Sequence, residues 1–322
     1  MPVALALVVL TGAGGCGGDD LPAASPAAVS TTATTTATVP APTPPFEVGT
    51  VTETLVDTTR VTPATSQQPE RPSRTLVTTI IYPDSPGPFP LIVFSHGLTG
   101  TPERHTELSS AWARAGYVVA MPAFPLTNAA VPDASTNAGD VKNQPGDVSF
   151  VIDRMIAANR DSTSPVFSRI LPDRIGIAGH SLGAATTYAV AQNDCCRDDR
   201  VDAVMIMSGV RLVNLDGDHL DRMPPIMMLH GDADPLLNVQ IGDDVYAQLN
   251  APKWFVRLLG AGHAPAYENT PSPWDDVVTA STTDFWQAYL PPTVGPPDPA
   301  TLDRLRADAV LDKISTLQAD PG

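Results

Sequence analysis

The feature that most constrains the fold of this chain is the pentapeptide Gly-His-Ser-Leu-Gly at residues 179–183. It follows an apolar run at 174–178 that is typical of a short buried strand, and it precedes a helix-forming run at 184–192. A strand that turns directly into a helix leaves no room for side chains beside the turn, so glycine is needed on both sides of the serine. The first helical turn points backbone N–H groups at any oxyanion that forms there. The pattern therefore predicts that the Ser181 hydroxyl stands above the end of a buried strand.

Strands and helices are expected to alternate along most of the chain. The two earliest candidate strands, 49–56 and 75–82, alternate apolar and polar residues as half-exposed antiparallel strands do. The later candidates are continuous apolar runs, typical of a parallel sheet that is buried on both faces. These are 90–94, 117–121, 175–178, 203–207, 225–230 and 254–259, the last of which we expect to be the final strand.

Helix-forming segments separate these apolar runs. They are 108–115, 147–158, 184–192, 239–249 and 275–289. The alternation predicts the α/β class, with a mostly parallel central sheet flanked by helices. Only a short segment, 208–223, connects two of the core strands, so no large cap over the sheet is expected.

Length and composition indicate one α/β domain with an additional segment at each end. The chain has 322 residues, of which 43% are hydrophobic, and we place the folded domain at 47–290. Residues 17–46 are rich in Ala, Thr and Pro and are predicted to be a disordered tether. Residues 291–322 are predicted to be a Pro-rich tail with a peripheral helix at 301–317.

The first sixteen residues are predicted to be a signal segment. An apolar run at 3–10 is too short to span a bilayer, and the sequence Ala-Gly-Gly-Cys that ends at Cys16 resembles a bacterial lipobox. That resemblance implies acylation of Cys16 after cleavage and tethering to a membrane. The alternative is a secreted protein with a disordered start. Either way we expect export, to the cell surface or beyond it.

The charge of the chain excludes some partners. The formal net charge is −16, so nucleic acid and anionic membrane surfaces should repel the folded domain. The two other cysteines, Cys195 and Cys196, are adjacent in sequence. Two loop thiols or a vicinal disulfide are both more consistent with this spacing than a metal site.

A serine hydroxyl needs a base, and that base needs an orienting carboxylate. Five of the six histidines lie within the pentapeptide, in a turn, at a strand end or in polar segments; they are His96, His105, His180, His219 and His230. The sixth, His263, follows the apolar run 254–259 in a loop of small residues, which can bring an imidazole back over the sheet edge. Asp232 and Asp234 follow another strand at the same edge, and either carboxylate could reach His263.

An oxyanion site needs two preorganised N–H donors. Leu182, the residue after the serine, supplies one of them. We expect the other from the glycine-containing turn at 95–100, with Leu98 as the donor. The alternative is that this segment is an ordinary connection between a strand and a helix.

Taken together, His96-Gly97 after a strand, the serine pentapeptide, the His-Gly-Asp-Ala-Asp segment at 230–234 and the Gly-Ala-Gly-His loop at 260–263 resemble the α/β-hydrolase superfamily. Within it the chain is similar to the branch of dienelactone hydrolases and platelet-activating-factor acetylhydrolases, which is related to cutinases and polyester hydrolases. The resemblance covers about 46–290 and favours Asp234 over Asp232 as the acid of a triad in the order Ser181, Asp234, His263.

The resemblance implies an exported serine hydrolase that cleaves carboxylic esters through an acyl-enzyme, with no metal or organic cofactor. Dienelactone hydrolases proper have a cysteine nucleophile, and Ser181 stands at that position here. The substrate is expected to be a small-molecule, lipid or polymer ester. Alternatives are a phospholipase A2-like acetylhydrolase, a cutinase-type polyester hydrolase, and a surface binding protein that has lost catalysis.

Overall fold

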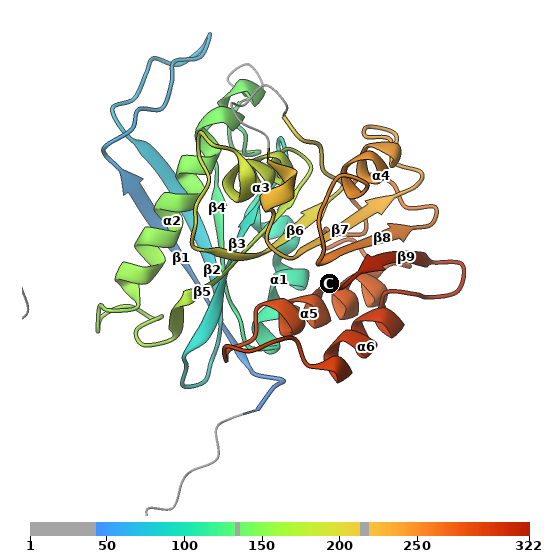
Figure 1. Cartoon of the computed structure of the whole chain (residues 1–322). Coiled ribbons are helices and arrows are strands. Elements are labelled where there is room, and N and C mark those ends of the chain that lie inside the picture. The colour runs from blue at the N-terminus through green and yellow to red at the C-terminus, as the bar shows by residue number, and fades with distance from the viewer. Residues whose placement is uncertain (1–42, 133–135, 213–218) are drawn as a thin grey trace, which may run out of the picture. The chain divides into compact units, whose positions relative to one another are not determined.

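The computed structural model describes residues 43–132, 136–212 and 219–322 (Figure 1). Within these residues nine strands form one sheet in the order β1-β2-β4-β3-β5-β6-β7-β8-β9. The strands are β1 (Val48–Asp57), β2 (Arg74–Pro83), β3 (Phe89–Ser95), β4 (Val118–Ala123), β5 (Ile170–His180), β6 (Val201–Met207), β7 (Ile226–Gly231), β8 (Lys253–Leu258) and β9 (Ser315–Asp320).

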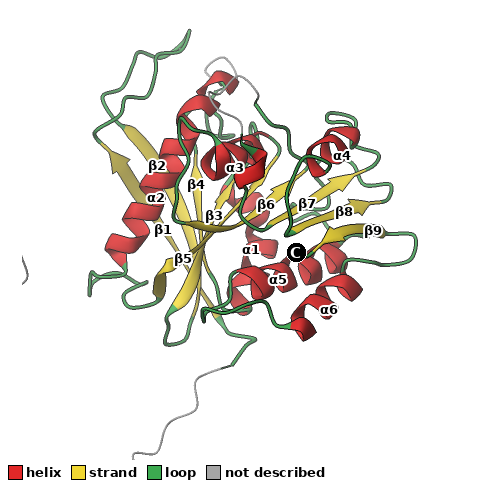
Figure 2. Ribbon diagram, in the orientation of Figure 1, coloured by secondary structure: helices red, strands yellow, loops and turns green. Residues whose placement is uncertain are grey.

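Helices cover both faces of the sheet (Figure 2). They are α1 (Thr106–Arg114), α2 (Gln144–Ala158), α3 (Leu182–Gln192), α4 (Gln240–Tyr246), α5 (Asp275–Tyr289) and α6 (Pro299–Asp308). The apolar residues of α2, α3 and α4 belong to one buried cluster, and those of α1, α5 and α6 belong to a second cluster. The sheet thus separates two hydrophobic cores, as the α/β class requires.

The pairing of the strands confirms the predicted mixture of directions. β1 pairs antiparallel with β2, and β2 pairs antiparallel with β4. From β4 through β3, β5, β6 and β7 to β8, every neighbouring pair is parallel. The sheet is therefore mostly parallel, and the C-terminal ends of β3, β5, β7 and β8 lie along one edge.

The C-terminal end of the chain differs from the prediction. The sequence predicts one short, charged peripheral helix over 301–317, but α6 ends at Asp308 and Ser315–Asp320 forms β9, which pairs antiparallel with β8. Without β9 the outer edge of β8 would have unpaired backbone N–H and C=O groups. Hydrogen bonding of residues 315–320 to that edge therefore replaces the predicted continuation of the helix. The strand predicted over 254–259 is consequently not the last one, and the segment predicted as a tail contributes to the sheet.

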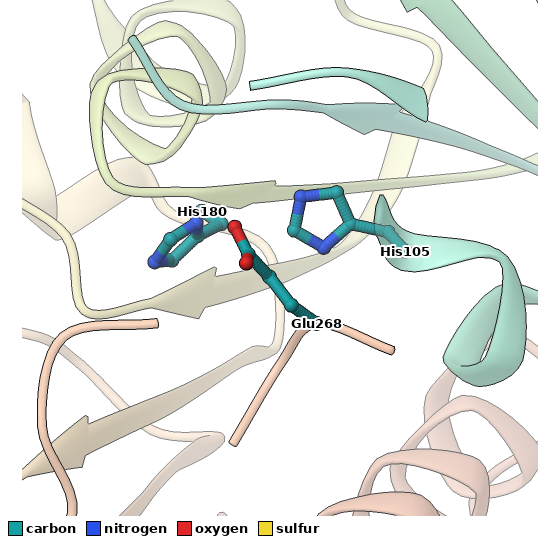
Figure 3. A group of neighbouring side chains, drawn as sticks. All are labelled: His105, His180 and Glu268. Atoms are coloured by element: carbon teal, nitrogen blue, oxygen red, sulfur yellow. The ribbon is translucent and has the colours of Figure 1, made fainter. Parts of the chain in front are cut away.

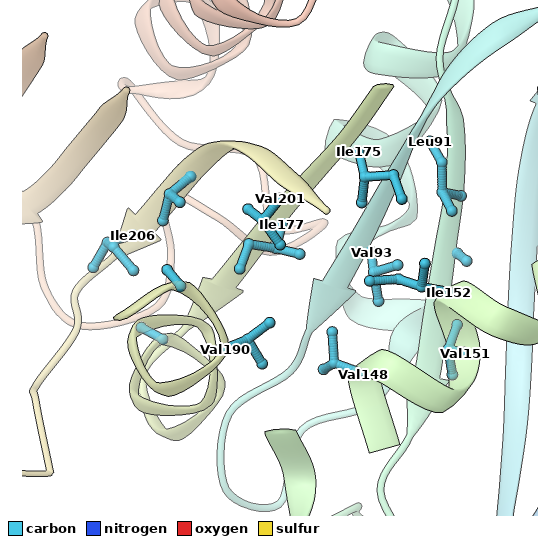
Figure 4. Close-up of a cluster of buried hydrophobic side chains, with 14 of the residues drawn as sticks. Leu91, Val93, Val148, Val151, Ile152, Ile175, Ile177, Val190, Val201 and Ile206 are labelled. Carbon is cyan, nitrogen blue, oxygen red and sulfur yellow. The ribbon is translucent and has the colours of Figure 1, made fainter. Parts of the chain in front are cut away.

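The packing against α2 and α3 holds the end of β5 in place. Leu91 and Val93 of β3 face the same cluster as Ile175 and Ile177 of β5, because alternate residues of a strand share a face. Figure 4 shows these side chains against Val148, Val151 and Ile152 of α2 and Val190 of α3. The strand that leads to Ser181 is therefore fixed on both faces, since Ala178 belongs to the opposite cluster.

A buried cluster of two arginines and three aspartates links β1 and β2 to α2; its members are Asp57, Arg60, Arg74, Asp140 and Asp147. The Arg74 guanidinium donates to both oxygens of Asp147 at 2.6 Å, and its two terminal nitrogens donate to Asp140 at 3.1 and 2.8 Å. Arg60 donates to Asp147 at 2.8 Å and to Asp57 at 2.7 Å. We call this group the arginine–aspartate cluster.

The described part of the connection from β6 to β7 holds no large cap, only the 3-10 turn Leu220–Arg222. At the end of α3, Cys195 and Cys196 are joined by a disulfide bond. Among the described residues no helix is both long and apolar enough to cross a bilayer.

Candidate active site

Ser181 occupies a strained turn between β5 and α3. Its backbone has φ 56° and ψ −119°, a conformation that L-residues rarely adopt. A Cβ atom added at Gly179 would lie 2.3 Å from the carbonyl oxygen of Gly183, and one added at Gly183 would lie 2.0 Å from that of Ser95. Both glycines are therefore required by close backbone contacts, and the turn presents the Ser181 side chain at the C-terminal edge of the sheet.

Three side chains from distant parts of the sequence form one hydrogen-bonded chain. The Ser181 Oγ atom lies 2.7 Å from Nε2 of His263, and Nδ1 of His263 lies 2.7 Å from Oδ2 of Asp234. The carboxylate accepts from Nδ1, which leaves Nε2 free to accept the serine proton. The His263 side chain keeps 13% of its surface exposed, whereas that of Asp234 is fully buried.

The structure distinguishes the two candidate carboxylates. Asp232 is exposed and its Oδ1 accepts the backbone N–H of Gly260 at 2.6 Å, so it holds the loop and does not contact His263. Asp234 also accepts the N–H groups of Leu236 and Leu237 at 2.8 and 2.9 Å. Burial opposes the charge of Asp234, but these N–H groups and His263 lower its pKa below the usual value.

The two leucines expected to supply oxyanion donors belong to segments that adjoin Ser181. Leu182 is the first residue of α3, and Leu98 follows Gly97, where an added Cβ atom would lie 3.0 Å from Cβ of Ser181. In the described part of the chain, neither leucine N–H donates a hydrogen bond to another residue. Both groups are thus free to donate, and their role as an oxyanion site stays a prediction.

A cavity of about 420 Å³ lies beside the turn that carries Leu98. Its walls include Thr101, Pro102 and Glu103 from the chain after that turn. They also include several residues between 123 and 132, part of the loop after β4. Ser181, Asp234 and His263 are not among the residues that line this cavity.

Sequence reasoning missed one group of residues near this site. His105 and His180, two of the histidines not chosen as the catalytic base, lie close to Glu268 in the structure. No spacing along the chain indicates this group, because its members lie far apart in the sequence, on a 3-10 helix, a strand and a loop. Cys16, the predicted lipidation site, lies outside the described residues.

A mostly parallel sheet with flanking helices, and a serine at the turn from a central strand into a helix, define the α/β-hydrolase superfamily. The model of the dienelactone hydrolase family matches residues 76–291, and the chain belongs to that family. It is a hydrolase by this membership, in a family whose members often cleave esters. A search among curated proteins found no match to the sequence.

Proposed function

We propose that this protein is a serine hydrolase that cleaves carboxylic esters through an acyl-enzyme. The observation that carries the proposal is the hydrogen-bonded chain from Asp234 through His263 to Ser181, with 2.7 Å between each pair. Such a chain makes a hydroxyl nucleophilic because the imidazole accepts its proton and the carboxylate stabilises the imidazolium.

In the proposed mechanism Ser181 Oγ attacks the ester carbonyl carbon while His263 Nε2 takes the hydroxyl proton. The carbonyl oxygen becomes an oxyanion that accepts from the N–H groups of Leu98 and Leu182. His263 then gives its proton to the leaving alcohol, and the acyl group stays on Ser181. Water, deprotonated by His263, attacks the acyl-enzyme and releases the acid.

The surroundings of the triad favour esters with an apolar part. Leu98, whose N–H is the proposed oxyanion donor, is 43% exposed. Leu236, two residues after Asp234, is 71% exposed. Exposed leucines beside a catalytic group favour an apolar acyl or alcohol moiety. Nitrophenyl esters of increasing chain length, an oxidised phospholipid and a polyester film would separate a general esterase from its phospholipase-like and cutinase-like alternatives.

The Ser181→Ala variant tests the proposal. Turnover of a short nitrophenyl ester should fall by about 10⁴-fold or more, because the nucleophile is lost. A fluorophosphonate, which reacts only with an activated serine, should label the parent protein and leave the variant unlabelled.

Ser208→Ala is the matched control. Ser208 directly follows the neighbouring strand β6, has a positive φ of 42° as Ser181 does, and donates its hydroxyl to that of Tyr267 at 3.2 Å. This variant should keep its label and most of its turnover. Full activity in folded Ser181→Ala protein, or no label on the parent protein, would contradict the proposal and favour a binding protein.

We further propose that the protein is exported and that Cys16 carries a lipid, on the strength of the sequence that precedes it. Mass spectrometry of the N-terminal peptide from the producing cell tests this directly. An unmodified peptide that contains residues 1–16 would contradict it.

A further inference from the structure

A second group of polar side chains lies beside the triad, on its own set of elements. His105 ends the 3-10 helix Pro102–His105 ahead of α1, His180 ends β5, and Glu268 lies in the loop between β8 and α5. One potential ligand atom from each residue lies within 4.8 Å of the others. Figure 3 shows the Glu268 carboxylate between the two imidazole rings. We call this group the histidine–glutamate cluster.

Hydrogen bonds to backbone carbonyls fix the tautomers of both rings. His105 Nδ1 lies 2.9 Å from the carbonyl oxygen of Tyr267, and His180 Nε2 lies 2.9 Å from that of His263. A carbonyl oxygen can only accept, so the hydrogens are on His105 Nδ1 and His180 Nε2. His105 Nε2 and His180 Nδ1 are therefore left as lone-pair nitrogens.

The free nitrogen of His105 has no hydrogen-bond partner. His105 is 1% exposed, and its Nε2 atom is buried without a donor anywhere in the described part of the chain. A buried acceptor without a partner is costly, and few such groups occur in native proteins. The atoms that the other two members of the cluster offer, His180 Nδ1 and the Glu268 carboxylate oxygens, are acceptors as well.

The two imidazoles are neutral at pH 7. Burial lowers the pKa of His105 to about 4 and that of His180 to about 3. The Arg104 guanidinium lies 3.5 Å from a carboxylate oxygen of Glu268 and is half exposed.

We propose that the histidine–glutamate cluster is a binding site for a divalent transition-metal ion, with His105 Nε2, His180 Nδ1 and the Glu268 carboxylate as ligands. Two imidazoles and one carboxylate are a donor set typical of zinc, whereas magnesium and calcium prefer oxygen ligands alone. Metal-binding histidines usually donate their other N–H to a carbonyl or carboxylate, as both do here.

The exposure of the cluster also suits a metal ion. The Glu268 side chain keeps 21% of its surface exposed, so an ion can reach it from solvent and displace Arg104. Zinc bonds of about 2.0–2.2 Å would draw the three residues closer together. The ion would tie the loop that carries His263 to the end of β5, which makes the site structural and independent of the proposed ester chemistry.

Titration calorimetry of the full-length protein with zinc chloride tests the site. The parent protein should bind one equivalent, and Glu268→Gln should bind at least about tenfold more weakly. Glu107→Gln is the matched control, because it removes the same charge from an exposed position in the first turn of α1. It should bind zinc as the parent does, and magnesium chloride should give no binding in any of the three proteins.

His263→Ala distinguishes the cluster from the triad, where a metal could also meet an imidazole and a carboxylate. This variant keeps the backbone carbonyl that His180 contacts, so zinc should still bind. A melting temperature that rises with zinc concentration in the parent and in His263→Ala, but not in Glu268→Gln, gives a second readout. No zinc binding by the parent, unchanged binding in Glu268→Gln, or loss of binding in His263→Ala would overturn the proposal.

Discussion

Two groups of largely buried polar side chains, one joining β1 and β2 to α2 and the other at the end of β5, differ in how completely their hydrogen bonds are paired. In the arginine–aspartate cluster every guanidinium faces a carboxylate, and Arg74 alone makes four hydrogen bonds to Asp140 and Asp147. In the histidine–glutamate cluster two lone-pair nitrogens and a carboxylate come together, and His105 Nε2 has no partner. The first group is satisfied internally, and the second has capacity left for a ligand.

The completeness of hydrogen-bond pairing distinguishes a cluster with a structural role from one that can bind a ligand or react. A fully paired cluster fixes the elements that it joins, here β1, β2 and α2, and has no remaining group that can react. The triad also differs from the fully paired cluster, because the proton of the Ser181 hydroxyl can move to Nε2 of His263. Substitutions in the paired cluster should therefore reduce stability, whereas those in the triad should reduce turnover.

The largest effect is expected for Asp234→Asn. The amide carries no negative charge to stabilise the imidazolium, and its NH2 group can donate to Nδ1 and hold the ring in the wrong tautomer, so kcat/KM should fall by about 10⁴-fold. Thermal unfolding should change little in comparison. Asp232→Asn is the control: it alters an exposed loop carboxylate two residues away and should keep most of the activity. Equal losses in the two variants would show that Asp234 has no special role.

Arg74→Leu comes next and should act on stability. It leaves Asp140 and Asp147 buried without their main cation, which typically costs about 3–5 kcal/mol of unfolding free energy. Burial already raises the pKa of Asp147 against the opposing effect of Arg74. Urea unfolding measures the cost, and kcat/KM per folded molecule should be nearly unchanged.

Arg60→Leu provides the matched control for Arg74. The Arg60 side chain is 31% exposed and that of Arg74 is 1% exposed, although both donate to Asp147. Solvent screens the exposed charge, so Arg60→Leu should cost about 1 kcal/mol or less. A cost as large as that of Arg74→Leu would mean that burial does not decide the energetics of this cluster.

Asp284 of α5 is intermediate between the two clusters, because only one of its carboxylate oxygens has a hydrogen-bond partner among the described residues. Its Oδ1 accepts from Arg304 at 3.3 Å, but its Oδ2 is buried without a partner among the described residues. Burial, together with the Asp308 carboxylate, raises the pKa of Asp284 to about 6 against the opposing charge of Arg304. The native state thus holds a proton that the unfolded chain releases near pH 4.

This pKa predicts a pH dependence. The contribution of Asp284 is fully present below about pH 4 and is lost as the pH rises through about 6, because the folded form must then bury a charge. Between pH 4 and pH 8 the parent should lose on the order of 2 kcal/mol more unfolding free energy than Asp284→Asn. Asp303→Asn, at an exposed position of α6, should follow the parent. Identical pH profiles for the parent and Asp284→Asn would refute the assignment.

Local sequence patterns were sufficient for the parts of the fold that are held by local chemistry. The glycines at 179 and 183 imply the turn at Ser181 because backbone contacts exclude any side chain there, and the apolar runs imply buried parallel strands. The strand order then places Asp234 and His263 at the edge where Ser181 lies. The alternation of strands and helices and the mostly parallel sheet were therefore accessible from the sequence, whereas the order of the strands within the sheet was not predicted.

The parts that the sequence did not predict depend on pairing between distant segments. Residues 315–320 carry no strong strand signal and form β9 because β8 has a free edge. His105 is buried, and its N–H is accepted by the backbone carbonyl of Tyr267, 162 residues later in the chain. A contact of that kind leaves no pattern in either segment, so the histidine–glutamate cluster could be found only in three dimensions.

The pairing of β9 with β8 also affects self-association. β8 is apolar and fully buried at Trp254, Val256 and Leu258, and the six residues of β9 cover its backbone with a mostly exposed, polar strand. A short polar strand is a poor template for pairing with a second molecule. Removal of β9 by a protease would expose the unpaired backbone edge of the apolar strand β8, and we expect aggregation as its first visible effect.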